Sequence, residues 1–361
     1  MSLRQTPLAG RHSAHGARFT EFGGWEMPVE YESITAEHAA VREAAGKFDV
    51  SHMGQVGVAG PDAGRLLQRL TTNDVTALSP GDSQYSMITN DEGMILDDTI
   101  VYCLGTEDYL FIPNAGHDEA MADRWETHRD EWTLDADVTN RTEAIAMVAV
   151  QGPDEVDLVA DRAEAAVERL GRFEVASSEV AGVESWVART GYTGEDGFEL
   201  MVPSGEATAL WDALECDPIG LGARDTLRTE MGYLLSGQDF DPVEEPRTPY
   251  EAGVGFTVKL DTEFVGRDAL ERVDAEGVDE RFTGVTLIDR GVPRHGYDVL
   301  DPDGGPIGHL TSGTMSPTLG EPIGLGYVDI AYTEPDTLVH VTIRGEPKKA
   351  KIRAPPFLPG K

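Results

Sequence analysis

Two adjacent carboxylates, Asp97 and Asp98, open a segment that otherwise has the composition of a buried β-strand, Met-Ile-Leu-Asp-Asp-Thr-Ile-Val-Tyr-Cys at 94–103. Because side chains in a strand point alternately to opposite faces, the two acids cannot face the same way. Asp98 is expected to share a face with Ile100 and Tyr102, so that one acid lies against an apolar and aromatic wall. Burying a carboxylate is costly unless a partner compensates its charge, which indicates a use for it. The alternative is a turn at the strand entry with both acids in water.

A pair of arginines, Arg224 and Arg228, is the second candidate for chemistry. Glycines at 220 and 222 precede a predicted helix, and residues four apart lie on one helical face. An arginine in the first turn of a helix opposes the helix dipole, which indicates another reason for its position. The planar guanidinium matches the two oxygens of a carboxylate, so the pair could bind a carboxylate-bearing ligand. The alternative is an ion pair with one of the many acids of the chain.

A glycine-rich connection between two predicted strands, 189–200, is the third candidate. Its glycines allow the backbone to approach a ligand closely, and Tyr192 within it could stack on a planar heterocycle. Glu199 is a polar residue in the strand that follows. Alternation places Glu199 opposite to Phe198, so a solvent-facing Glu199 is an equally good interpretation.

The elements that must position these residues alternate irregularly, without the regular βα repeat of a parallel sheet. Composition and glycine or proline stops predict helices over 37–46, 62–70, 117–129 and 154–170. Strands are predicted over 85–88, 95–103, 108–112, 144–150, 183–190 and 198–202, the first two joined as a hairpin through the turn 89–93. The stretch 241–248, rich in proline and acidic residues, is the best candidate for a domain boundary. Beyond it, short strands predict a small antiparallel barrel or sandwich, over 284–287, 297–300, 307–312, 324–328 and 338–343.

Length and composition narrow the class of protein. A chain of 361 residues exceeds one comfortable core and predicts two or three domains. No apolar stretch approaches a membrane span and the start has no apolar signal core, so we expect an intracellular, cytoplasmic protein. The two cysteines, Cys103 and Cys216, exclude a disulfide framework and a cysteine-rich zinc site. No phosphate-binding loop, dinucleotide fingerprint or nucleophile elbow occurs, and we expect no bound metal.

Charge is the most unusual bulk property. There are 65 acidic residues against 29 basic ones, a formal net charge of −36 spread along the whole chain. Such a polyanion should repel nucleic acid and anionic membranes. We interpret the excess as adaptation to high salt, where self-repulsion is screened. The one basic cluster lies near the end, in Lys348, Lys349, Lys351, Arg353 and Lys361. It could attract an anionic partner, or be surplus charge on a frayed end.

Several of these segments resemble the aminomethyltransferase family, the T-proteins of the glycine cleavage system. The resemblance rests on segments in the family order, at 19–28, 48–54, 93–98, 189–200, 220–239 and 311–319. It extends from near residue 19 to near residue 328, almost the whole chain. It implies an α+β fold, a three-domain cloverleaf around a central folate channel. Two domains would have antiparallel sheets with helices, formed by 1–51 with 141–242 and by 52–140; the third, 243–361, would be a small β-barrel or jelly-roll-like domain.

The resemblance also implies roles for individual residues. Asp98 matches the essential acid, which orients and activates a folate nitrogen. Asp97 and Arg228 could hold the ligand-binding residues in place without touching the ligand themselves. The folate-binding positions are matched by Met53, Tyr85, Ile100, Tyr102, Asn114, Tyr192, Glu199 and Arg224, with Glu199 at the pterin edge and Arg224 near the benzoyl-glutamate portion. The strand alternation that groups Asp98 with Ile100 and Tyr102 agrees with this assignment.

The implied reaction moves an aminomethyl carbon from the lipoyl arm of H-protein to tetrahydrofolate and releases ammonia. H-protein, glycine decarboxylase and dihydrolipoyl dehydrogenase are the implied partners, with tetrahydrofolate as co-substrate. Alternatives on the same fold are a folate-dependent demethylase of methylated sulfur or nitrogen compounds and a non-catalytic folate-binding protein. The chain departs from the family pattern at Gly93-Met94, where a Gly-Gly pair is usual, and by lacking an aromatic tail that some relatives have.

Overall fold

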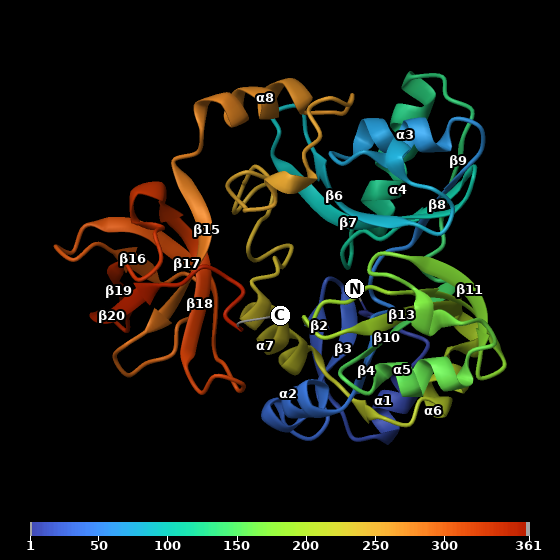
Figure 1. Ribbon diagram of the computed structural model, residues 1–361, viewed down its shortest axis with the longest axis horizontal. Helices are drawn as coiled ribbons and strands as arrows, with labels where there is room; N and C mark the ends of the chain where they lie inside the picture. The colour runs from blue at the N-terminus through green and yellow to red at the C-terminus, as the bar shows by residue number, and fades with distance from the viewer. Residues whose placement is uncertain (1, 359–361) are drawn as a thin grey trace. The chain divides into compact units, whose positions relative to one another are not determined.

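The computed structural model describes residues 2–358 as two compact units. The first comprises the chain up to residue 86 together with 98–224, and the second comprises 87–97 together with the chain from residue 225 onward. The expected mixed α+β class, with antiparallel sheets and a C-terminal barrel, is confirmed (Figure 1). The three-domain boundaries stay a prediction. No helix among the described residues combines the length and apolar character needed to cross a membrane.

The first unit is centred on a six-stranded sheet, in the order β11-β12-β13-β10-β4-β14. Every neighbouring pair is antiparallel except β4 with β14. The strands are β4 (Gly46–Asp49), β10 (Ile145–Gln151), β11 (Val175–Val180), β12 (Val183–Ala188), β13 (Gly197–Pro203) and β14 (Asp217–Pro218). A small sheet precedes it, in the order β1-β3-β2, formed by β1 (Arg4–Gln5), β2 (Arg18–Phe22) and β3 (Trp25–Glu30).

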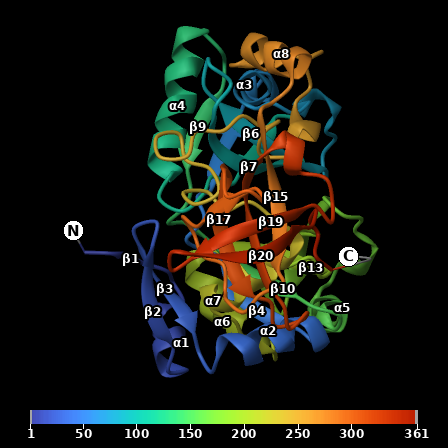
Figure 2. The same cartoon turned by 90° about the vertical axis from the view of Figure 1, so that its left-hand side faces the viewer.

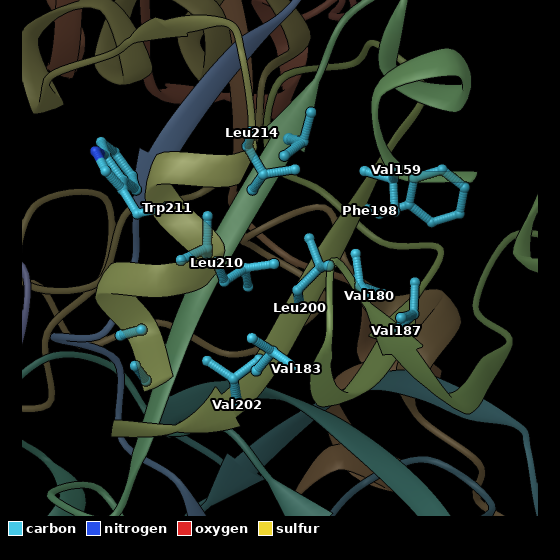
Figure 3. Packing of buried hydrophobic residues seen from close by; sticks show 14 of the residues in the cluster. Val159, Val180, Val183, Val187, Phe198, Leu200, Val202, Leu210, Trp211 and Leu214 are labelled. Carbon is cyan, nitrogen blue, oxygen red and sulfur yellow. The ribbon is translucent and has the colours of Figure 1, made fainter. Parts of the chain in front are cut away.

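Helices bury one face of this sheet in an apolar core. Leu210, Trp211 and Leu214 belong to one buried cluster with strand residues such as Leu200 and Val187, all labelled in Figure 3. Each such side chain removed from water contributes roughly 1.5–3 kcal/mol. Four helices of this unit are α1 (Ala9–Ala14), α2 (Ile34–Glu43), α5 (Glu155–Val159) and α6 (Ala207–Ala213). Helix α7 (Leu221–Met231) follows, and its first turn still belongs to the first unit.

The predicted helix over 154–170 is wrong. Only α5 and two single 3₁₀ turns form there, Ala160–Arg162 and Val167–Arg169. Val159 and Val167 are both buried in the same core, and Ala163 forms a β-bridge with Val180. The chain therefore bends to follow the sheet edge, because tertiary packing outweighs its helix-forming composition. Strand β11, which supplies that edge, was not predicted.

A five-stranded antiparallel sheet, in the order β6-β7-β8-β5-β9, carries the acidic pair. Its strands are β5 (Val56–Ala59), β6 (Ser83–Thr89), β7 (Ile95–Gly105), β8 (Asp108–Phe111) and β9 (Asp137–Asn140), with helices α3 (Ala63–Leu70) and α4 (Asp118–Glu131). The predicted hairpin between β6 and β7 is confirmed. Its turn is closed by the Asn90 N–H, which donates to Met94 O over 3.0 Å, and only Gly93 in it has a positive φ, +78°. Met94 is thus accommodated without strain where the family usually has glycine.

The second unit contains a closed six-stranded barrel, in the order β15-β18-β17-β16-β19-β20, which confirms the expected barrel. Figure 2 shows β17, β19 and β20 of this barrel. Its strands are β15 (Glu280–Leu287), β16 (Asp298–Leu300), β17 (Pro306–Met315), β18 (Pro322–Asp329), β19 (Leu338–Ile343) and β20 (Glu346–Ile352). Inward side chains such as Val285, Val341 and Ile352 fill it. Helix α8 (Arg267–Glu276) precedes the barrel.

Three residues of the basic cluster lie on β20, a strand that was not predicted. Lys348, Lys349 and Lys351 are paired into the barrel through β20, so the alternative of a frayed end is wrong for them. Lys351 Nζ lies 3.2 Å from Asp336 Oδ1, and Arg353 Nη1 lies 3.3 Å from Glu321 Oε2. Lys361 lies outside the described residues.

Candidate active site

Strand β7 separates the two acids as its alternation predicts. Asp97, Thr99 and Val101 are buried on one face, whereas Asp98 and Ile100 are half-buried on the other. The interpretation of both acids in a solvated turn is therefore wrong. Asp98 is the acid that remains accessible, and the strand holds its backbone fixed.

Both carboxylate oxygens of Asp98 accept hydrogen bonds from neutral donors. The Tyr85 hydroxyl, on the neighbouring strand β6, donates to Oδ2 over 2.6 Å. The Asn114 side-chain amide, just beyond β8, donates to Oδ1 over 2.5 Å and to the Asp98 carbonyl over 3.3 Å. Hydrogen bonds to an ionised acceptor are shorter and stronger than neutral ones, so these two fix the orientation of the carboxylate. Three predicted site residues thus form one group.

A second group surrounds Glu199 on β13. Thr190 donates its hydroxyl to Glu199 Oε2, and the Tyr102 hydroxyl lies 3.5 Å from the same oxygen and 3.2 Å from Thr190 Oγ1. Burial raises the pKa of the Glu199 carboxyl, while the hydrogen bond from Thr190 and the positive charge of Arg224 act in the opposite direction. The solvent-facing interpretation of Glu199 is wrong, because its carboxyl is engaged by side chains of the first unit.

Tyr192 and Arg224 form a third group. The guanidinium carbon of Arg224 lies 4.4 Å from the centre of the Tyr192 ring, a cation–π arrangement. Arg224 stands in the first turn of α7, as predicted, and its N–H donates to Gly220 O. One face of the Tyr192 ring, which was expected to stack on a heterocycle, therefore contacts the Arg224 guanidinium instead.

Arg228 does not share the environment of Arg224. It is buried, and its guanidinium donates to Asp239 Oδ2 over 2.6 Å, to Asp225 Oδ1 over 2.8 Å and to Ser312 Oγ over 2.7 Å. Arg228 is therefore the buried cation of a structural ion pair with these aspartates. This is the alternative that the sequence left open for the arginine pair, and it applies to Arg228.

The remaining predicted position, Met53, lies half-buried in the turn after β4, where its N–H donates to Val50 O. No contact among the described residues joins Met53 to the three groups, so its place in the site stays a prediction. Among the described residues, no cluster of three His, Cys, Asp or Glu side chains could hold a metal ion.

Two residues of this region were missed by sequence reasoning. Thr190 links Tyr102 to Glu199 through its hydroxyl. In the sequence, only its position two residues before Tyr192 indicates that it belongs to the site. His52 is fully buried next to Met53, and neither of its ring nitrogens has a hydrogen-bond partner among the described residues. Burial and the nearby charge of Arg224 lower the pKa of His52 to about 3. The imidazole is therefore neutral at ordinary pH.

Family models match both parts of the chain. A model described as the GCVT N-terminal domain matches residues 8–262, and one described as the glycine cleavage T-protein C-terminal barrel domain matches residues 281–358. These two matches define a glycine cleavage T-protein, with the second match covering the closed barrel.

Relatives and a solved structure agree over the full length. A probable aminomethyltransferase of Haloarcula marismortui is 65% identical over 361 residues, with 99% of each chain covered. An aminomethyltransferase of Rubrobacter xylanophilus is 45% identical over 361 residues, covering 99% of this chain and 94% of that protein. The crystal structure of glycine cleavage system aminomethyltransferase T from Bartonella henselae matches with a TM-score of 0.92 and 31% identity, covering 99% of this chain and 98% of that one.

The chain belongs to the aminomethyltransferase family, the T-proteins of the glycine cleavage system. The family and function expected from the sequence are confirmed at this level, and the protein is a transferase of glycine cleavage. Relatives from Haloarcula and Halobacterium support the halophilic source that the acidic composition indicated.

Proposed function

We propose that the protein transfers the aminomethyl carbon from lipoylated H-protein to tetrahydrofolate, with Asp98 as the catalytic carboxylate. The observation that carries this assignment is the pair of hydrogen bonds from Tyr85 and Asn114 to the two Asp98 oxygens. A carboxylate held on both oxygens, yet half-buried rather than sealed in the core, is suited to hold a substrate N–H and take up its proton.

The side chains of the three groups fit the chemistry of a reduced folate. A pterin presents N–H donors along one edge, which carboxylate oxygens of Asp98 and Glu199 can accept. The glutamate portion carries carboxylates, which the guanidinium of Arg224 can bind through paired hydrogen bonds. Tetrahydrofolate would supply the nucleophilic nitrogen that receives the one-carbon unit. Tyr192, which is half-buried, offers aromatic surface for a planar ring, whereas Tyr102 is fully buried and reaches the site through its hydroxyl contacts with Thr190 and Glu199.

Within this scheme each residue of the chain has a separate task. Asp98 orients the nucleophilic nitrogen and manages its proton, which typically contributes roughly a hundred- to ten-thousand-fold in rate. Tyr85 and Asn114 keep the Asp98 carboxylate in one orientation. Glu199 accepts hydrogen bonds from the pterin edge, and Thr190 and Tyr102 hold its Oε2 in place.

The direct test is Asp98→Asn. This variant keeps the size of the side chain and a hydrogen-bonding oxygen but loses the charge and the basic site. We expect it to bind tetrahydrofolate nearly as wild type does and to lose most ammonia release from aminomethylated H-protein. Near-normal ammonia release by Asp98→Asn would remove Asp98 from the catalytic role.

Glycine decarboxylase and dihydrolipoyl dehydrogenase are the further partners that this function implies. We also propose that the β20 lysines attract an anionic partner, an acidic H-protein or the polyglutamate of a folate. Lys348 and Lys349 form no ion pair among the described residues, unlike Lys351. Reversing both charges should raise the KM for one of the two substrates, and an unchanged KM for both would end this proposal.

A further inference from the structure

Gln151, the last residue of β10, lies in the core of the first unit beside the loop that precedes β13. Its side chain is 1% exposed. The amide Nε2 donates to Thr190 O over 3.1 Å and to Val150 O over 3.3 Å, and Oε1 accepts the Thr193 hydroxyl over 3.0 Å. One buried amide therefore bonds the loop 190–197 at two points, three residues apart.

Two glycines make room for this amide. A Cβ at Gly191 would lie 1.9 Å from Gln151 Oε1, and one at Gly197 would lie 2.2 Å from Nε2. Neither glycine has a positive φ, so space rather than backbone conformation requires them. The two glycine Cα atoms and the Gln151 side chain are thus packed against one another, and the loop is fitted around the amide.

The far side of the loop has its own anchors. Arg42 of α2 donates to Thr193 O and to Glu195 Oε1, each over 2.8 Å, and Gly152 N–H donates to Asp196 O over 3.0 Å. These contacts hold residues 193–196. Among the described side chains that bond the loop, Gln151 is the one that bonds the Thr190 backbone, next to the Glu199 and Tyr192 groups.

We propose that Gln151 is a positioning residue for folate binding. By fixing the backbone at Thr190 and the hydroxyl of Thr193, it sets the Thr190 hydroxyl that binds Glu199 and the Tyr192 ring that supports Arg224. Gln151 touches none of the reacting atoms, and Asp98 takes its orientation from Tyr85 and Asn114 instead. Loss of Gln151 therefore weakens binding and leaves turnover of bound substrate largely intact. This inference rests on the proposed function.

The test is a comparison of Gln151→Met with a matched control, Gln55→Leu. Gln55 is 0% exposed, and its Nε2 donates to Ile145 O at the opposite end of β10, over 3.1 Å. Both variants lose a buried glutamine hydrogen bond, but only one reaches the loop. We expect Gln151→Met to raise the Kd for tetrahydrofolate about tenfold, with kcat within about threefold of wild type. Gln55→Leu should lower the melting temperature and leave the Kd within about twofold.

A second variant keeps the test decisive if Gln151→Met folds poorly. Thr193→Val removes the hydroxyl bonded to Oε1 without changing β10, and should raise the same Kd. The double variant should be less impaired than the two single effects combined, because both act through one contact. Equal Kd values for Gln151→Met, Thr193→Val and Gln55→Leu, or a collapse of kcat at unchanged Kd, would overturn the inference alone. Wild-type protein that takes up no tetrahydrofolate in calorimetry would overturn the proposed function, and this inference with it.

Discussion

The Tyr85 hydroxyl and the Asp98 carboxylate are joined by a hydrogen bond of 2.6 Å between neighbouring strands of one sheet. Since Asn114 bonds the other carboxylate oxygen, the acid cannot rotate without breaking one of two short bonds. A strand register, fixed by the pairing of β6 with β7 and of β7 with β8, therefore determines where the proposed catalytic oxygens lie.

Tyr85→Phe should lower kcat and leave the fold intact. The variant loses one charge-assisted hydrogen bond, worth about 1.5–3 kcal/mol, and this predicts a fall in kcat on the order of tenfold to a hundredfold. The measurement is ammonia release at saturating tetrahydrofolate. Tyr109→Phe, which alters a buried tyrosine of the same sheet on β8, is the control and should keep wild-type kcat. Equal rates for the two variants would contradict a role for Tyr85 in orienting Asp98.

His52 should make the fold sensitive to acid. Burial lowers its pKa in the folded protein to about 3, from the ordinary 6.5 that the unfolded chain has. The unfolded state therefore takes up a proton first, so stability is full above pH 6.5 and is lost as the pH falls from there toward 3. At pH 5 this loss amounts to about 2 kcal/mol in the free energy of unfolding.

Denaturant unfolding at pH 7 and pH 5, in constant molar salt, measures this effect. His52→Leu cannot titrate and should lose less stability than wild type between the two pH values. His15→Leu changes an exposed histidine and serves as the control. If His52→Leu and wild type lose the same free energy on acidification, the neutral buried imidazole is not the cause.

Local pattern predicted the strand that carries Asp98, because alternation along β7 depends on neighbouring residues alone. It also predicted the turn at Gly93 and most strands of the barrel. Pattern could not predict that Arg228 would bond Ser312, 84 residues further along the chain. Nor could it predict that the N-terminal His12, which has no acid in register nearby, would bond Asp49 Oδ2 over 2.7 Å. Such pairings are decided by tertiary packing.

Glu199→Gln should stabilise the protein near neutral pH. Burial raises the pKa of Glu199, so the folded state holds the proton more tightly than the unfolded state, and stability due to this group rises as the pH falls through its folded pKa. Glutamine mimics the protonated acid and removes this dependence. Thermal melts should show a larger gain in melting temperature of Glu199→Gln over wild type at pH 8 than at pH 5, a comparison in which the contributions of other titrating groups cancel. A variant less stable than wild type at pH 8 would show that the ionised carboxylate is the form the site favours.

Salt should raise the melting temperature of the protein. A net charge of −36 is spread over the chain, and repulsion among these acids destabilises the compact state unless counterions screen it. The screening length falls from about 10 Å at 0.1 M to about 3 Å at 1 M salt, so most of the gain should appear within this range. Differential scanning calorimetry in KCl, with sucrose at matched water activity as the control for solvent exclusion, separates screening from general stabilisation. A melting temperature that does not change with KCl would contradict the interpretation of the acidic surface as an adaptation to high salt.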